Sequence, residues 1–375
     1  MQLNIYSDKN YLPEGMEPVI ILYPFWKEFI PSEKHPWSRA YGKYIEISNS
    51  LFKMTSLEEA DIVVMPTNWR LIRGDSWRSK VNKEAENLSI KFADKVANSG
   101  KEIVVFFAGD CSSEEVPIKN VTVIRTAAYR SKKTQKHIVM PSFTEDFVKE
   151  YLEGLMPLRQ KSNKPIVGFC GLAVDNSWET KLKELLYHGL MLTKSLELGV
   201  SPYKGQNLRS QALKILAESP SLINTNFIIR DKSVFLNIDD IERRQKTRAE
   251  YVKNMVESDY ILCCRGSGNY SIRLYETLSC GRIPIFIDTD CVLPEDSTID
   301  WKKYCVWIDE KEIPYIAEKV AEFHSNISDQ EFLDLQHECR NLWKNRLSPE
   351  GFYTNLHLHF QAKEIASELN LGTSK

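Results

Sequence analysis

Short apolar runs recur along the chain, and they predict strands that are buried on both faces. Ten of them are rich in Val, Ile and Phe, namely VIILYPF, ADIVVMP, EIVVFFAGD, VTVIRTA, HIVMPS, PIVGFCGL, NFIIRD, YILCCRG, IPIFID and CVWIDE. Each run is too short for a core helix, and none alternates cleanly between apolar and polar positions. This pattern is typical of the covered strands of parallel sheets.

Helix-like segments lie between many of these runs, for example residues 76–100, 177–199 and 239–259. Strands that alternate with helices indicate an α/β architecture. Because ten strands are more than a single sheet usually holds, the pattern predicts two Rossmann-like halves.

The predicted boundary between the halves is Leu155–Pro165, a polar stretch that contains two prolines. It gives an N-terminal domain of residues 1–159 and a C-terminal domain of residues 165–347. Residues 348–375 are predicted to be a C-terminal helix, capped by Ser348, that could pack back on the N-terminal domain.

Composition narrows the class of protein. The chain has 375 residues, 42% of them hydrophobic, and a net charge of −2, so nucleic acid and anionic membranes are not its expected main partners. Several of the eight cysteines lie in apolar runs, which favours buried thiols in a reducing compartment. The N-terminal stretch MQLNIYSDKNYLPEG lacks the apolar core of a signal peptide, and no stretch approaches the roughly 20 apolar residues of a membrane span. We therefore expect a soluble, cytoplasmic protein.

One stretch, CCRGSGNYSIRLYETLSCG at residues 263–281, predicts an anion site. It reads as a strand end, a glycine-containing loop and then a helix, and open α/β sheets bind ligands at the carboxyl ends of their strands. The free N–H groups and the dipole of such a helix favour a phosphate. The candidate nucleotide-binding residues in the loop are Gly266, Ser267, Gly268, Asn269 and Ser271.

Three charged residues complete this candidate site. Arg265 and Arg273 could neutralise a pyrophosphate, and Glu276 lies one helical turn beyond Arg273, where a carboxylate can accept both hydroxyls of a ribose. On spacing alone, an alternative stays open. Arg273 and Glu276 could form a surface ion pair, and the Gly-Ser-Gly segment could be a plain turn.

Residues 251–301 resemble the nucleotide-sugar half of exostosin-like glycosyltransferases, the family 47 type. The resemblance rests on an ordered series of matches: Tyr251, Met255, Ser258, Leu262, Cys263, Arg265, Gly266, Gly268, Ser271, Arg273, Leu274, Glu276, Gly281, Ile283, Pro284, Asp290, Leu293, Pro294, Ile299 and Trp301. Outside this block the likeness is thinner.

The resemblance implies the GT-B fold, in which two Rossmann-like domains face each other across a cleft and the donor is bound mainly by the second domain. It also implies an inverting transfer from a nucleotide diphosphate sugar, with UDP expected from the family analogy alone, to a glycan acceptor. No obligatory metal and no other cofactor is expected. Arg265 and Arg273 would stabilise the departing diphosphate.

The general base is the least defined part of this hypothesis. Asp110 follows the run EIVVFF and is the first choice, although it could instead cap the turn CSSEE. Asp175 and His137 are weaker candidates. His137 stands where the family pattern has an aspartate, which places its role in doubt.

Two other patterns and two rival functions need weighing. Asp288-Thr289-Asp290 invites a metal-binding interpretation, but it ends a predicted strand and Asp290 belongs to the family pattern. The spacing of His357 and His359 suits no zinc site on a helix. A Rossmann oxidoreductase is disfavoured because no Gly-x-Gly-x-x-Gly follows an early strand. A non-catalytic nucleotide- or carbohydrate-binding relative stays open as the main alternative.

Overall fold

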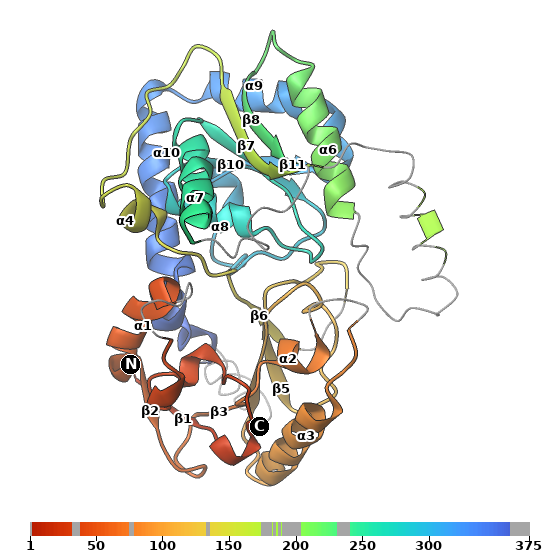
Figure 1. Cartoon of the computed structure of the whole chain (residues 1–375), viewed down its shortest axis with the longest axis vertical. Helices are drawn as coiled ribbons and strands as arrows, with labels where there is room; N and C mark the ends of the chain where they lie inside the picture. Colours follow the sequence, from red (N-terminus) through yellow and green to blue (C-terminus); the bar gives the residue numbers. More distant parts are fainter. Residues whose placement is uncertain are drawn as a thin grey trace, which may run out of the picture. The chain divides into compact units, whose positions relative to one another are not determined.

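The computed structural model describes residues 2–31, 38–74, 79–132, 136–173, 204–230 and 241–360, together with the isolated positions 182, 185, 186 and 189. The chain divides into two units, residues 1–143 with 345–375, and residues 144–344. Each unit is built on a parallel sheet of its own (Figure 1). The predicted α/β class with two Rossmann-like domains is therefore confirmed.

The first unit holds a six-stranded sheet in the order β2-β1-β3-β4-β5-β6, and every neighbouring pair is parallel. Its elements are β1 (Leu3–Tyr6), η1 (Lys9–Tyr11), η2 (Ile20–Leu22), η3 (Lys27–Phe29), α1 (Ser38–Leu51), β2 (Phe52–Met54), β3 (Ile62–Val64), α2 (Trp69–Arg73), α3 (Lys83–Ala97), β4 (Ile103–Phe107), β5 (Val121–Arg125), β6 (His137–Val139) and α11 (Pro349–Asn355).

Alternate residues of these strands feed two separate cores, one on each face of the sheet. Val64 and Val104 belong to the core beneath α1 and α11, whereas Val63 and Val105 belong to the core beneath α3. Because side chains alternate across a strand, both faces are covered. This explains why the predicted runs were continuously apolar.

The run VIILYPF is not a strand, and this prediction was wrong. Ile20–Leu22 form a 3₁₀ turn, η2, whose Ile21 and Leu22 are buried. Apolar runs of this length do not distinguish a strand from a buried turn, and prolines at positions 18 and 24 bracket this one. The short strands β1 and β2 were not predicted.

The C-terminal helix α11 packs on α1 within the first unit. The ring centroids of Tyr353 and Tyr44 lie 4.1 Å apart, and Tyr44 is buried. Ser348 caps α11 as expected, since its Oγ accepts a hydrogen bond of 3.0 Å from the backbone N–H of Gly351.

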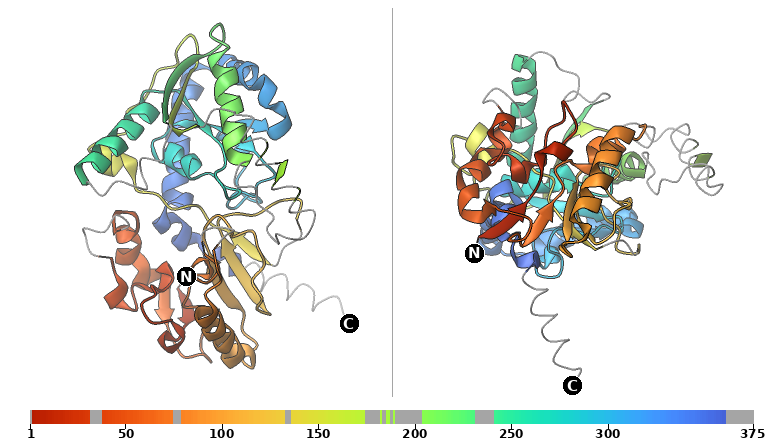
Figure 2. Two further views of the ribbon diagram at one scale, coloured as in Figure 1. Left: turned by 45° about the vertical axis from the view of Figure 1, so that its right-hand side comes forward. Right: turned by 90° about the horizontal axis from the view of Figure 1, so that it is seen from below.

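The second unit holds a five-stranded parallel sheet in the order β11-β10-β9-β7-β8. The helices α7 and α8 lie along one face, while α6 packs with α9 on the other (Figures 1 and 2). Its elements are α4 (Phe147–Tyr151), β7 (Ile166–Leu172), α6 (Lys204–Ala217), β8 (Asn224–Arg230), α7 (Ile241–Val256), β9 (Tyr260–Cys263), α8 (Ile272–Ser279), β10 (Ile283–Asp288), η4 (Trp301–Lys303), β11 (Val306–Asp309), η5 (Glu310–Tyr315), α9 (Ile316–Asn326), α10 (Asp329–Leu342) and η6 (Trp343–Leu347), which runs across the unit boundary.

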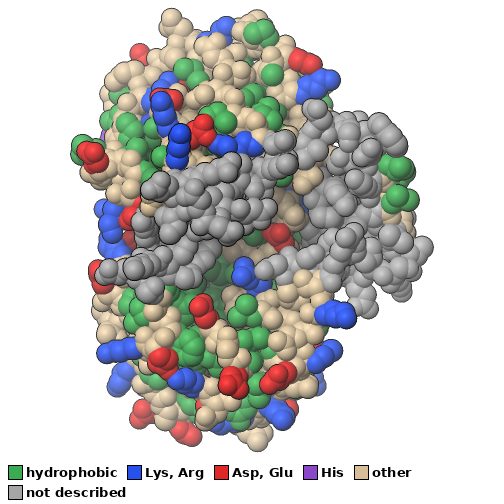
Figure 3. All heavy atoms as spheres, viewed as in Figure 1, with side chains coloured by type: hydrophobic (Ala, Val, Ile, Leu, Met, Phe, Trp, Pro, Cys, Tyr) green, Lys and Arg blue, Asp and Glu red, His purple; other side chains and the backbone are tan. Residues whose placement is uncertain are grey.

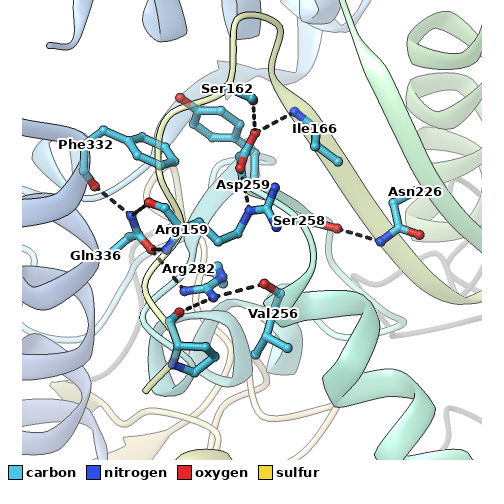
Figure 4. Close-up of polar contacts among 12 residues, drawn as sticks. Arg159, Ser162, Ile166, Asn226, Val256, Ser258, Asp259, Arg282, Phe332 and Gln336 are labelled. Carbon is cyan, nitrogen blue, oxygen red and sulfur yellow. Dashed lines mark hydrogen bonds and ion pairs between the residues drawn. The ribbon is translucent and has the colours of Figure 1, made fainter. Parts of the chain in front are cut away.

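The polar stretch Leu155–Pro165 lies inside the second unit rather than at its edge. The buried carboxylate of Asp259 accepts hydrogen bonds from Arg159 Nε at 2.6 Å, from Ser162 Oγ at 2.7 Å and from the backbone N–H of Ile166 at 2.9 Å (Figure 4). A buried carboxylate needs such partners. Asp259 therefore anchors this stretch to the first residues of β7 and β9. The units divide instead between Phe143 and Thr144.

The state of the cysteines and the charges on the surface agree with the composition. All eight cysteines are buried and none of them forms a disulfide, as predicted. Positive and negative side chains are interspersed over the viewed face of both units (Figure 3). Within the described ranges, no helix is both long and apolar enough to cross a bilayer.

Candidate functional site

The candidate site lies where the strand order of the second sheet reverses. The chain passes from β7 to β8 on one side, and β9 then pairs with the other side of β7. Ligands of open α/β sheets bind at the carboxyl ends of the strands that flank such a reversal. The predicted loop, residues 264–270, follows β9 at this point and leads into α8.

The beginning of α8 carries an unsatisfied polar atom. Ser271 is the N-cap residue, yet its hydroxyl makes no cap hydrogen bond, and its buried Oγ has no hydrogen-bond partner. The first N–H groups of a helix also lack intrahelical partners. A buried hydroxyl therefore lies at this end of the helix without an acceptor from the protein.

The other end of α8 is occupied by cations. Arg340 Nη1 donates to the carbonyl of Ser279 at 2.6 Å, and Arg282 Nη1 donates to the carbonyls of Cys280 at 3.4 Å and Gly281 at 3.2 Å. Cations at a helix C-terminus complement its dipole. By the same dipole, the matching partner for the N-terminal end of α8 would be an anion.

Arg273 is held in the first turn of α8 by groups from two elements, β7 and α7. Its Nη2 donates to the carbonyl of Cys170 on β7 at 2.7 Å, and its Nε donates to the hydroxyl of Tyr251 on α7 at 3.2 Å. The guanidinium lies 4.2 Å from the ring centroid of Phe169. A Cβ at position 171 would lie 2.7 Å from Nη2, so the glycine there permits the approach.

Glu276 is buried, with 5% of its surface exposed, and both of its oxygens have partners from the protein. The hydroxyl of Tyr251 donates to Oε2, and Arg248 Nη2 lies 2.9 Å from Oε1. Glu276 is linked to Arg273 through Tyr251. A simple surface ion pair between Arg273 and Glu276, the alternative left open by the spacing, therefore does not describe this pair.

Tyr251 keeps its proton at neutral pH. Burial, reinforced by the charge of Glu276, raises its pKa well above the usual value. The hydroxyl can therefore donate to Glu276 while it accepts from Arg273. A neutral residue thus connects the two charged residues that the sequence had singled out.

Arg265 and Asn269 shape the loop from within. Arg265 is buried and donates from Nη1 to Asn269 Oδ1 at 3.0 Å and from Nη2 to the carbonyl of Ser267 at 2.8 Å. Asn269 is fully buried and also accepts from Thr289 Oγ1 at 2.6 Å. Gly266 is exposed. The geometry thus favours a bracing role for the side chains of Arg265 and Asn269 and leaves Gly266 exposed.

Arg209 was not predicted from the sequence, although it joins the two strand ends at the reversal. Its Nη1 donates to the carbonyl of Leu172 at 2.9 Å, and its Nη2 donates to the carbonyl of Arg265 at 3.2 Å. Its Nε is buried and has no hydrogen-bond partner. Nothing in its local sequence marks it, because its partners are distant along the chain.

The candidates for a general base are placed separately. Asp110 lies in the first unit, in the turn after β4, and is partly buried. The backbone N–H of the preceding residue, Gly109, donates a hydrogen bond of 2.9 Å to Thr126 Oγ1. His137 begins β6 and pairs with Val123. Asp175 lies outside the described residues.

The two remaining patterns lie at the turn after β10 and directly after α11. Asp288 accepts a hydrogen bond of 2.9 Å from the backbone N–H of Cys291, and Asp290 adopts a left-handed φ of 64°. This pair therefore shapes the turn after β10. His357 Nδ1 contacts the carbonyl of Thr354 at 2.9 Å. In the described part of the chain, acidic, histidine and cysteine side chains form no group of three or more that could hold a metal ion.

Comparison with known proteins bears on this same region. Residues 201–323 match the Exostosin GT47 domain. The matched range lies within the second unit and includes the candidate site. The resemblance found at residues 251–301 lies within the matched range, so that identification is confirmed.

Individual relatives match shorter stretches of the exostosin-like chain. Exostosin-1 of Drosophila melanogaster is 30% identical over 105 residues, which are 28% of this chain and 13% of that protein. A probable glucuronosyltransferase 47 A of Physcomitrium patens is 34% identical over 93 residues, 25% of this chain and 20% of that protein. The matches thus span at most a fifth of these relatives.

One solved structure aligns with nearly the whole chain. A glycosyltransferase from Rickettsia africae covers 96% of this chain and 98% of its own, with 12% identity and a TM-score of 0.37. A likeness at this level carries no argument about the site.

Proposed function

We propose that the protein is a glycosyltransferase that binds a nucleotide diphosphate sugar at residues 264–276 and transfers the sugar to a glycan acceptor. One observation carries the proposal. The buried, unpartnered hydroxyl of Ser271 lies at the N-terminus of α8, next to Arg273, at the strand reversal of the unit that contains the match to the Exostosin GT47 domain. A diphosphate supplies the acceptors that this arrangement lacks.

The residues present fit the charge changes of glycosyl transfer. The departing diphosphate gains negative charge, and preorganised donors aimed at that charge lower the barrier. The Ser271 hydroxyl and the first N–H groups of α8 would donate to it, and Arg273 would supply positive charge. Because each carboxylate oxygen accepts about two hydrogen bonds, Glu276 keeps one acceptor position on each oxygen for the ribose hydroxyls.

The finer features of the reaction are part of the proposal. A UDP-sugar donor, inversion at the anomeric carbon, independence of a metal and a cytoplasmic location all follow from the family resemblance or from the sequence. Arg273 in the first turn of α8 supports a diphosphate site that is stabilised by the protein's own charge.

Donor turnover tests the proposal. UDP-, GDP- and ADP-sugars are incubated with the protein and candidate acceptor glycans, with and without a chelator, and released nucleotide is measured. We expect release with a UDP-sugar that the chelator does not abolish. Activity lost with chelator and restored by manganese would contradict metal independence. Nucleotide binding without turnover on any acceptor would favour the non-catalytic relative.

Asp110 is the proposed general base. Its carboxylate would take the proton of the acceptor hydroxyl as that oxygen attacks the anomeric carbon. Asp110→Asn keeps the shape of the side chain and removes its basicity. We expect this variant to lose turnover but to bind donor as the wild type does. Full activity in the variant would remove Asp110 from the mechanism.

A further inference from the structure

Arg248 is a partner of Glu276 that lies outside the loop motif and outside the series of family matches. It comes from α7, and its Nη2 lies 2.9 Å from Glu276 Oε1, while Tyr251 from the same helix donates to Oε2. Both oxygens of the carboxylate are therefore held by residues of a single helix, α7. This fixes both the position and the plane of the carboxylate.

Aromatic rings hold Arg248 itself in place. Its guanidinium carbon lies 4.4 Å from the ring centroid of Phe147 on α4 and 5.3 Å from that of Tyr251. Phe147 is fully buried, and the Arg248 side chain is 20% exposed. Stacking on aromatic faces restricts the orientation of the planar guanidinium, which a flexible ammonium would not reproduce.

We propose that Arg248 is a positioning residue for the donor: it holds Glu276 so that the two remaining acceptor positions of the carboxylate meet the ribose hydroxyls. This inference rests on the proposed function. A carboxylate without Arg248 could rotate about its side-chain bonds, and its acceptor positions would no longer match a fixed diol.

Two other roles of Arg248 would have different effects on nucleotide binding. If Arg248 only neutralised Glu276 and competed with the ligand for it, removing Arg248 would free the carboxylate and strengthen nucleotide binding. If it served only the fold, its removal would lower stability and leave the contribution of the ribose hydroxyls unchanged. Only a positioning residue couples to the ribose itself.

The test compares the dissociation constants of UDP and 2′-deoxy-UDP by titration calorimetry in the wild type and in Arg248→Met. In the wild type we expect loss of the 2′-hydroxyl to weaken binding about tenfold, because a buried acceptor is left without its partner. In Arg248→Met we expect weaker UDP binding and a ratio between the two nucleotides that falls to about twofold, the loss of coupling that a double-mutant cycle measures.

Two further variants keep the test decisive. Lys253→Met on the same helix removes only an exposed pair with Glu257 and should leave both constants unchanged. Arg248→Lys keeps the charge and a long stem, so it should fold, and we expect its ratio to fall as well because the planar fork is lost.

The outcomes separate the inference from the function on which it rests. An unchanged ratio in both Arg248 variants, or tighter UDP binding in Arg248→Met, would overturn the positioning role alone. Failure of the wild-type protein to bind UDP at all would overturn the proposed donor site together with this inference.

Discussion

The hydroxyl of Tyr251 lies between Arg273 and Glu276, accepting a hydrogen bond of 3.2 Å from Arg273 Nε and donating one to Glu276 Oε2. The two charged residues are thereby set in one geometry by a third residue that is buried. This arrangement should make the proposed donor site sensitive to the loss of a single oxygen atom.

Tyr251→Phe removes that oxygen and keeps the ring. We expect the free energy of unfolding to fall by about 1–3 kcal/mol, because a buried guanidinium N–H and a carboxylate oxygen each lose a partner. UDP binding should weaken as well. Denaturant unfolding and calorimetry measure the two effects. A variant with wild-type stability and affinity would show that the hydroxyl does not organise the site.

Ser271 and Ser348 form a matched pair of helix N-cap serines with opposite roles. Ser348 caps α11, whereas Ser271 Oγ has no partner. Ser348→Ala should cost about 1 kcal/mol of stability, and Ser271→Ala should change stability by less than about 0.5 kcal/mol. Only Ser271→Ala should weaken UDP binding, by about fivefold. Equal stability losses in both variants would contradict an open anion site at α8.

Gly205 lies in α6 against the loop at residues 264–270. A Cβ there would overlap with the carbonyl oxygens of Arg265 and Gly266. Gly205→Ala should therefore displace the loop, lowering stability by about 1–3 kcal/mol and weakening nucleotide binding.

Gly42 in α1 is the control for this substitution, because a Cβ at that position meets nothing within 4 Å. Gly42→Ala should raise stability by up to about 1 kcal/mol, since alanine is the better helix former. Thermal unfolding and UDP titration of both variants provide the comparison. Normal UDP affinity in Gly205→Ala would show that α6 does not set the loop.

His324 should make the stability of the protein depend on pH. Its Nε2 lies 2.6 Å from the carbonyl of Ser162, and its Nδ1 lies 2.9 Å from the hydroxyl of Tyr260. A carbonyl only accepts, so Nε2 donates and Nδ1 accepts from the tyrosine. Burial, together with the charge of Lys161, lowers the pKa of His324 below its usual 6.5, although the Ser162 bond and Asp259 oppose this.

A lowered pKa means that the unfolded chain binds more protons than the folded one between the two pKa values. The contribution of His324 to stability is therefore complete above about pH 6.5 and declines as the pH falls through the folded pKa. Urea unfolding of the wild type and of His324→Gln between about pH 5 and pH 8 measures this. The difference between the two stabilities should shrink toward acid pH. A difference that is constant with pH would contradict the assignment.

The sequence was sufficient for the elements that bury apolar residues continuously or follow a local motif. The strands β4, β9 and β10 and the loop before α8 were all placed correctly because their signals are local. The same reasoning misread VIILYPF, since burial alone does not specify a backbone conformation.

Contacts between distant segments explain what could not be predicted. The stretch Leu155–Pro165 looked like a linker because its anchors, Asp259 and Gln336, lie far along the chain. Arg248 and Arg209 were missed for the same reason, since each acts on residues of another element. Arg265 was expected to face the ligand, but its own loop accepts its donors.

Binding of UDP to the wild-type protein and to Arg273→Met, followed by calorimetry, tests the central claim most directly. Arg273→Met removes the cation at the start of α8 and keeps an apolar stem over Phe169. We predict saturable binding of UDP by the wild type and a loss of affinity of at least about tenfold in a variant that remains folded, because a charge-assisted contact is removed. Equal affinity in both proteins, or no binding of UDP by the wild type, would contradict a nucleotide diphosphate site at α8.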